Sequence, residues 1–190
     1  NPDGTPHAPS PDESNTADDE PVYELNFKCD LSEYEKYMDP EDRDAYLILV
    51  NTKNHLAETD IPSDLIYVKD SPAWRKDHQM REYAEKSLEA LFIEIRAAGF
   101  YNMMVLSTYR PYSNQRDLFV TYTQNEMNNN PSLTREEAEK IVLTYSTRPG
   151  TSEHQTGLAV DMDTLGTFTT DFQYEPEYIW LSENAWKFGF

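Results

Sequence analysis

Cysteine is nearly absent from this sequence, since Cys29 is the only one among 190 residues. No disulfide can form within the chain, so a hydrophobic core rather than a covalent crosslink must stabilise the fold. The length and a hydrophobic content of 38% are sufficient for such a core. We therefore expect one globular domain and exclude a small disulfide-rich module.

Basic residues and long apolar runs are also scarce. The chain has 16 lysines and arginines against 35 aspartates and glutamates, which gives a formal net charge of −19. A phosphate backbone needs a basic face on its partner, so this charge argues against a nucleic-acid partner. No apolar run approaches the roughly 20 residues of a membrane-spanning helix. The first residues also lack the basic start and apolar segment of a signal peptide, so the chain as given is expected to be soluble.

The first 22 residues differ in composition from the rest of the chain. They are rich in proline, serine and acidic residues and contain almost no apolar side chains. Such a composition cannot compensate for the entropy lost on ordering, and it predicts a disordered tail or linker. A remnant of cloning is the alternative interpretation. Residues 23–190 are expected to form the folded domain.

Strand and helix signals are mixed along residues 23–190. Short apolar runs predict strands at 45–51 (AYLILVN), 64–70, 103–107 and 157–163. Helical spacing or capping residues predict helices from Ser71-Pro72 to Gly99, through Phe119 and Tyr122, from Thr134 to about Tyr145, and at 182–190. The two kinds of element do not alternate regularly, which favours an α+β fold.

The stretch 151–163, TSEHQTGLAVDMD, contains a candidate metal site. His154 and Asp161 are seven residues apart, so a straight strand would direct them to opposite faces. Gly157 permits a bend that would bring the two side chains together. An imidazole and a carboxylate are common zinc ligands, although a catalytic zinc requires a third protein ligand. The alternation within 158–163 equally describes an ordinary half-exposed strand.

Four segments occur in the order and spacing of a known family: LVNTKNHL, STYRPYSNQ, RPGTSEHQTGLAVDMD and WLSENAWKFGF. Over residues 46–190 the chain resembles the VanY-like zinc D,D- and L,D-carboxypeptidases. The resemblance implies the hedgehog/D-Ala-D-Ala zinc-peptidase fold, an α+β fold in which helices flank a small, mostly antiparallel sheet. It also implies Zn²⁺ as cofactor and removal of the terminal D-alanine from peptidoglycan stem peptides.

The resemblance assigns roles to individual residues. His154 and Asp161 match two zinc ligands. The positions that match substrate-binding residues are Ser107, Tyr109, Arg110, Gln115 and Ser152. The planar fork of an arginine suits a free carboxylate, such as the C-terminus of a peptide. The alternatives are a turn histidine at 154, and an arginine at 110 that pairs with an acidic surface neighbour. Asp163 is expected on the solvated surface, with an orienting role beside the metal as the alternative.

The general base and the third zinc ligand are not found in the sequence. In the family a Glu-Pro-Trp-His element follows the segment that matches NAWKFGF, and its Glu and His fill these roles. The given sequence ends at Phe190, and neither His55 nor His78 has a matching neighbourhood. We expect this element beyond Phe190, so the given domain would lack its C-terminal segment. A truncated and inactive form is the alternative.

Two other functions share the same fold. One is a binding module for cell wall or protein without catalysis, and the other is an endopeptidase that cuts peptidoglycan crosslinks. A carboxylate clamp is of little use in mid-chain, which argues against the endopeptidase. The implied partner is a peptidoglycan stem peptide. The resemblance also implies a bacterial protein located outside the membrane or at the cell wall, with residues 1–22 as a tether.

Overall fold

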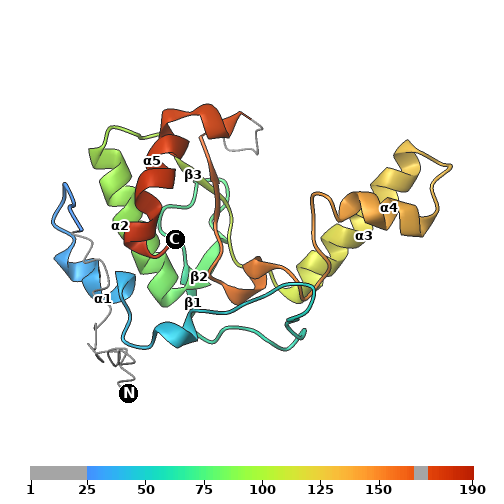
Figure 1. The fold of residues 1–190 in the computed structure, drawn as a ribbon, viewed down its shortest axis with the longest axis horizontal. Coiled ribbons are helices and arrows are strands. Elements are labelled where there is room, and N and C mark those ends of the chain that lie inside the picture. The colour runs from blue at the N-terminus through green and yellow to red at the C-terminus, as the bar shows by residue number, and fades with distance from the viewer. Residues whose placement is uncertain (1–24, 165–170) are drawn as a thin grey trace, which may run out of the picture.

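A computed structural model describes residues 25–164 and 171–190 of the chain (Figure 1). The helices and strands are, in chain order, α1 (Glu35–Met38), β1 (Leu65–Tyr67), β2 (Gln79–Arg81), α2 (Glu82–Ala97), β3 (Met104–Ser107), α3 (Tyr112–Asn129), α4 (Arg135–Val142), β4 (Asp161–Asp163) and α5 (Pro176–Asn184). The tail predicted at 1–22 lies outside the described residues. The elements confirm the α+β class.

The described strands form two antiparallel pairs, β1 with β2 and β3 with β4. Backbone hydrogen bonds connect the two pairs. The amide of Tyr109 donates to the carbonyl oxygen of Gln79 at 2.9 Å, and the amide of Arg81 donates to that of Gly157 at 2.9 Å. The predicted antiparallel strands are therefore present, and the segments that follow β3 and precede β4 are held against β2.

Helix α2 provides a large part of the core. Its apolar residues recur every three or four positions and therefore lie on one face. The buried members of this face are Leu88, Leu91, Phe92 and Ile95. They belong to one cluster with Met80 of β2, Val105 of β3 and Phe188 near the C-terminal end. Among the described residues, no helix has both the length and the apolar character needed to cross a membrane.

Helices α3 and α4 pack against each other and form an arm that extends away from the strands (Figure 1). The predicted capping box at the start of α4 is present: the Thr134 amide donates to the Glu137 carboxylate at 2.8 Å, and the Thr134 hydroxyl accepts from the Glu137 amide. Helix α4 ends at Val142 rather than near Tyr145. The arm lies between β3 and β4 in the sequence, so the chain leaves β3 to form the arm and returns from the arm to β4.

The predicted buried strand at 45–51 is wrong. Leu47 and Leu49 are 76% and 70% exposed, and Val50 alone in this run is fully buried. Residues 43–45 form a short 3-10 turn, and the residues after it follow an irregular path. The Arg81 guanidinium binds the carbonyl of Ala45 at 2.7 Å, which fixes the start of this segment on the surface.

The predicted helix start at Ser71-Pro72 is also wrong. The helix begins at Glu82, because Gln79–Arg81 pair with β1 and the buried Met80 enters the core from a strand. His78 was expected within this helix. It instead lies in the irregular segment before β2, where its buried ring contacts the Ser71 hydroxyl at 3.1 Å.

Candidate active site

A tight turn brings His154 towards β4. Residues Glu153–Thr156 form a 3-10 turn that ends at Gly157, whose φ of 72° is in the left-handed region. A Cβ at Gly157 would lie 3.0 Å from side-chain atoms of Arg81 and Leu65. Glycine is therefore required twice, for its backbone conformation and for its lack of a side chain. The predicted bend at Gly157 is present.

His154 and Asp161 converge beyond this turn. His154 Nε2 lies 3.0 Å from Asp161 Oδ2, and His154 Nδ1 lies 2.7 Å from the carbonyl oxygen of Thr108. A carbonyl oxygen only accepts, so Nδ1 carries a hydrogen, and in a neutral ring Nε2 would present its lone pair to the carboxylate. Two facing lone pairs repel unless a proton or a metal ion lies between them. This donor pair, with a carbonyl that orients the imidazole, fits part of a zinc site.

The described residues do not provide a complete set of ligands. Within 25–164 and 171–190, no three histidine, cysteine or acidic side chains are close enough to hold a metal ion together. His55 is in an exposed loop, with Nε2 2.6 Å from the carbonyl of Thr52. His78 is buried against Ser71. Of the three protein ligands that a catalytic zinc typically takes, His154 and Asp161 would supply two.

Arg110 is held in a fixed orientation next to this pair. One guanidinium nitrogen donates to Gln115 Oε1 at 2.7 Å and another donates to Ser107 Oγ at 3.0 Å. The Arg110 amide also donates to the carbonyl of His154 at 3.0 Å. Burial lowers the pKa of the guanidinium, and the carboxylate of Asp161 acts in the opposite direction. An arginine remains charged under such a shift, so the site contains a preoriented, partly buried cation.

Gln115 positions Arg110 from the base of the arm. Its side chain is only 1% exposed, and its amide nitrogen donates to the carbonyl of Thr147 at 2.7 Å. The amide nitrogen also lies within bonding distance of Ser146 Oγ, at 3.3 Å. Because the amide nitrogen of Gln115 binds the segment after α4, its Oε1 faces Arg110 and accepts from the guanidinium. The Gln115 side chain thus connects the arm with the Arg110 guanidinium.

The β3–β4 ladder places the two halves of the site together. Ser107 of β3 lies opposite Asp161 of β4, and an irregularity between Val105 and Ser107 inserts one extra residue into β3. The hydroxyl that supports Arg110 and the carboxylate that faces His154 are thereby brought to neighbouring positions.

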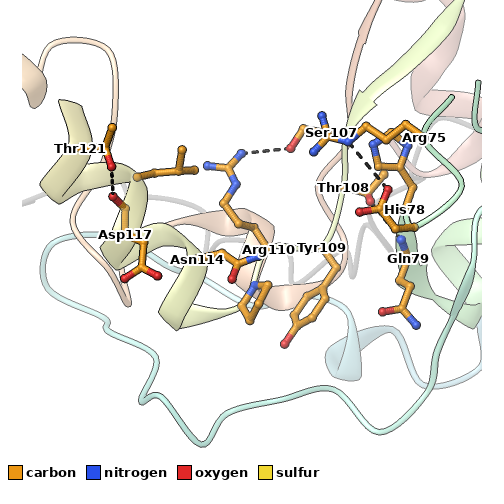
Figure 2. Close-up of a pocket in the computed structure, with 13 residues that line it drawn as sticks. Arg75, His78, Gln79, Ser107, Thr108, Tyr109, Arg110, Asn114, Asp117 and Thr121 are labelled. Atoms are coloured by element: carbon orange, nitrogen blue, oxygen red, sulfur yellow. Dashed lines mark hydrogen bonds and ion pairs between the residues drawn. The ribbon is translucent and has the colours of Figure 1, made fainter. Parts of the chain in front are cut away.

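A cavity of about 570 Å³ includes three of the predicted substrate-binding residues, Ser107, Tyr109 and Arg110 (Figure 2). His154 and Asp161 are not part of its lining. They lie next to it, because the Thr108 carbonyl binds His154 and the Ser107 position pairs with Asp161. The volume is within the range of pockets that bind small ligands. The Tyr109 ring points away from the Arg110 guanidinium (Figure 2), and burial raises the pKa of its hydroxyl.

Two predicted residues are placed differently from the others. Ser152 is buried at the start of the 3-10 turn, and its carbonyl accepts from the Gln155 amide at 3.1 Å, so it is not in the lining of the cavity. Asp163 was expected on the solvated surface, and this is wrong. It is 2% exposed, and its Oδ1 accepts from the Thr164 amide at 2.6 Å. The pairing of β4 with β3 turns Asp163 into the protein.

Thr108 was missed from the sequence. Its carbonyl orients His154, and its hydroxyl accepts from the Gln79 amide at 3.2 Å. A main-chain acceptor has no residue-type signal, so the sequence could not have indicated this role. Arg75 also lines the cavity and was not singled out, because it lies in a segment that was predicted to be the first turns of a helix.

Comparison with known proteins identifies the family. Residues 77–190 match the VanY family, described as D-alanyl-D-alanine carboxypeptidase. The chain is 28% identical to YodJ of Bacillus subtilis strain 168 over 183 residues, which cover 93% of this chain and 63% of YodJ. It is 32% identical to a D-alanyl-D-alanine carboxypeptidase of Enterococcus faecalis over 151 residues, or 79% of this chain and 51% of that protein. The chain thus spans less than two thirds of either relative.

Solved structures give the same result. VanYB in complex with D-alanine-D-alanine is 30% identical with a TM-score of 0.58, over 75% of this chain and 71% of that one. A VanY variant in complex with Zn(II) is 30% identical with a TM-score of 0.59, over 76% and 74%. The LdcB LD-carboxypeptidase is 26% identical with a TM-score of 0.61, over 74% and 63%. The chain therefore belongs to the VanY family of D-alanyl-D-alanine carboxypeptidases.

Proposed function

We propose that this chain forms the core of a zinc-dependent carboxypeptidase that removes the terminal D-alanine from peptidoglycan stem peptides. The observation that supports this most strongly is the position of Arg110, which Ser107 and Gln115 hold beside the His154–Asp161 pair. A fixed cation next to a metal-binding pair suits a reaction at the last peptide bond of a chain. Peptidoglycan lies outside the cytoplasmic membrane, so the proposed site of action is the bacterial cell wall.

Each group has a distinct task in this proposal. Arg110 binds the free carboxylate of the substrate through a charge-assisted, two-oxygen contact, and thereby positions the leaving D-amino acid. Gln115 and Ser107 keep the guanidinium from rotating. His154 and Asp161 hold the metal, and the Thr108 carbonyl keeps the imidazole in the tautomer that offers Nε2. Bound there, zinc supplies Lewis acidity that activates a water molecule and polarises the scissile carbonyl.

The complete site also requires a third protein ligand and a general base. The described residues contain no cluster of three ligands, so the experiments use the full natural protein. An endopeptidase is disfavoured because Arg110 recognises a free carboxylate, which an internal peptide bond lacks.

Product analysis tests the proposed reaction. We expect the zinc-loaded protein to release one D-alanine from stem peptides, detected by mass spectrometry, and to leave the same peptides uncleaved when their C-terminus is an amide. Cleavage of crosslinks with no need for a free carboxylate would instead indicate an endopeptidase. Binding of muropeptides without any turnover would indicate a binding module.

Metal content tests the assigned ligands separately from activity. We expect Asp161→Ala to lower the zinc bound per chain after dialysis, because one of the two converging ligands is lost. Asp163→Asn is the matched control two residues away on the same strand, and it should retain zinc. Full zinc occupancy in the Asp161 variant, measured by elemental analysis, would contradict the assignment.

A further inference from the structure

A second cavity, of about 320 Å³, has no task in the proposed reaction. Its lining includes Gln155 and Thr156 of the 3-10 turn that contains His154, and it shares no residue with the lining of the cavity at Arg110. Its apolar lining residues come from the irregular segment before β1, and they are Ile48, Leu56, Ile61 and Pro62. The volume is at the lower end of the range for pockets that bind small ligands.

Gln155 has a buried acceptor without a donor. Its side chain is 2% exposed, and its amide nitrogen donates to the carbonyl oxygens of Ala57 at 2.7 Å and Asp60 at 3.4 Å. Because a carbonyl only accepts, the amide cannot be turned around, and its oxygen must be directed away from both carbonyls. That oxygen accepts no hydrogen bond from the residues that the structure describes. An unpaired buried acceptor is costly, so a donor supplied by a ligand would be favoured there.

Asp60 adds a negative charge to the same lining. Its carboxylate accepts from the Ala57 amide at 2.7 Å, and its own amide donates to the Ala57 carbonyl at 3.1 Å, so a tight turn fixes the side chain. Within 25–164 and 171–190, Asp60 has no ion-pair partner. The cation in the lining, Arg81, is engaged elsewhere. It binds Asp64 at 2.9 Å and the carbonyl of Ala45 at 2.7 Å.

The two acceptors are positioned before any ligand arrives. The amide nitrogen of Gln155 and the carboxylate of Asp60 both bind Ala57, so one turn holds both side chains in place. Such preorganisation lowers the entropy lost on binding. The cavity therefore combines a fixed carboxylate and an unpaired carbonyl oxygen with apolar walls, and it has no uncompensated cation in its lining.

We propose that this cavity is a binding site for a primary ammonium group at the end of an alkyl chain. An ammonium has three donors and no acceptor, so it can donate to Gln155 Oε1 and to the Asp60 carboxylate at the same time. Its methylene groups pack against the apolar walls. A neutral alcohol has a single donor and gains no charge assistance, and an anion is repelled by Asp60. The inference is independent of the proposed carboxypeptidase function, and its test requires no turnover.

Titration of the full natural protein with pentylammonium chloride, followed by NMR at a fixed ionic strength of about 150 mM, tests the site. We expect saturable binding about tenfold tighter than that of pentan-1-ol, as a charge-assisted hydrogen bond would give. The side-chain amide signals of Gln155 should shift along the same binding curve. Removal of each methylene from the ligand should weaken binding by about threefold.

Three results would overturn the inference. Equal affinities for the amine and the alcohol would show that the site does not select a cation. Binding of the amine without a shift of the Gln155 amide would place the ligand elsewhere. An absence of saturable binding by both compounds would show that the cavity holds only water.

Asp60→Asn should reduce the preference for the amine to within about twofold of the alcohol. The variant should fold, because the asparagine oxygen can still accept from the Ala57 amide. Glu58→Gln is the matched control. It removes one negative charge from the same turn, but Glu58 is not in the lining, and its contact with Arg116 is exposed and 3.8 Å long. This variant should keep the full preference. Equal losses in the two variants would contradict a specific site and indicate general attraction to an acidic surface.

Nα-acetyl-lysine methylamide identifies the source of the ammonium group. Binding as tight as that of pentylammonium would indicate the side chain of a lysine within a peptide. Binding at least about tenfold weaker would indicate a free alkylamine, because the peptide backbone would then not fit at the opening of the cavity. Binding of methylammonium as tight as that of pentylammonium would contradict the role of the apolar walls and overturn the assignment.

Discussion

At the scale of single residues, the geometry of the candidate site depends on a glycine at the end of the turn before β4. Gly157 ends the turn that contains His154, and its carbonyl accepts from the Arg81 amide of β2. The turn is therefore fixed to a strand on one side and directed at Asp161 on the other. A side chain at this position would disturb both the backbone and the packing against Leu65 and Arg81.

Gly157→Ala should destabilise the protein more than Gly99→Ala does. Both glycines have positive φ, 72° and 103°, so both alanines carry the left-handed strain of about 1–2 kcal/mol. A Cβ at Gly99 meets nothing within 4 Å, whereas one at Gly157 meets two side chains at 3.0 Å. We expect an additional loss of about 1 kcal/mol for Gly157→Ala in urea unfolding. Equal losses would show that Leu65 and Arg81 yield without cost.

The sequence predicted the bend that brings His154 and Asp161 together, but not the groups that support these side chains. The spacing of His154 and Asp161 around a glycine required a bend, and the structure has that bend. The contribution of Thr108 is made by a carbonyl, which every residue possesses, so no residue type could signal it. Gln115 was assigned to the substrate, and in the structure it holds Arg110 in place.

At the scale of elements, α2 carries buried carboxylates on the side that faces the preceding segments. Glu85 is 1% exposed and Glu89 is 5% exposed. Burial raises the pKa of Glu89, but hydrogen bonds from Lys86 and Lys69 outweigh it and lower the pKa to about 2. Burial raises the pKa of Glu85, which accepts from the Lys69 amide. The Tyr34 hydroxyl also binds Glu89, at 3.1 Å, so these acids attach the N-terminal turns to the core helix.

Lys86→Met should lower the free energy of unfolding at pH 7 by about 1–3 kcal/mol, because it leaves two buried carboxylates without their shared cation. A carboxyl with a depressed folded pKa stabilises above its unfolded pKa and loses that effect as pH falls through the folded value. The contribution of Glu89 is therefore lost between about pH 4.5 and 2. In Lys86→Met the folded-state pKa of Glu89 rises towards its unfolded value, so stability should fall less over this pH range and the two proteins should converge in stability at low pH.

Lys140→Met is the control for this prediction, because Lys140 forms an exposed i,i+4 pair with Glu136 on α4. Surface pairs of this kind contribute about 0.3–0.5 kcal/mol, so denaturation curves should change little. Equal losses of unfolding free energy in both variants would contradict a stabilising pairing of Lys86 with the buried carboxylates. The same holds if the dependence of stability on acidic pH is unchanged in Lys86→Met.

Elements were predictable where local pattern and tertiary structure agree. The capping box of α4 and the apolar spacing of α2 are local signals, and both helices are present. The run at 45–51 had the apolarity of a buried strand, but no local pattern reveals whether a partner strand is available. Ser71-Pro72 is a normal helix start signal, yet Gln79–Arg81 gain more from pairing with β1 than from extending α2.

At the scale of the whole molecule, negative charge predominates. The net charge of −19 disfavours the compact state through self-repulsion, and it opposes the approach of anionic ligands everywhere except near local cations. Arg75 and Arg110 supply such cations in the cavity. This cavity thus contains two guanidinium groups in a chain whose net charge is negative.

Added salt should stabilise this protein at neutral pH. Raising NaCl from about 10 mM to about 300 mM shortens the Debye length to well below 10 Å and screens the repulsion between surface acids. We expect the Tm to rise by a few degrees, measured by calorimetry, and the same rise with KCl in place of NaCl. A fall in Tm would show that attractive surface pairs contribute more than the excess of acids.

The extra residue in β3 also determines which insertions and deletions would preserve the geometry of the site. Side chains alternate across a ladder, so a slip by one position would exchange the Asp161 carboxylate for the Met162 thioether on the working face. The irregularity between Val105 and Ser107 pins the alignment and penalises that slip. Insertions in the loop between α3 and α4 leave this alignment unchanged, whereas one residue gained or lost within β3 would shift Ser107 out of register with Asp161.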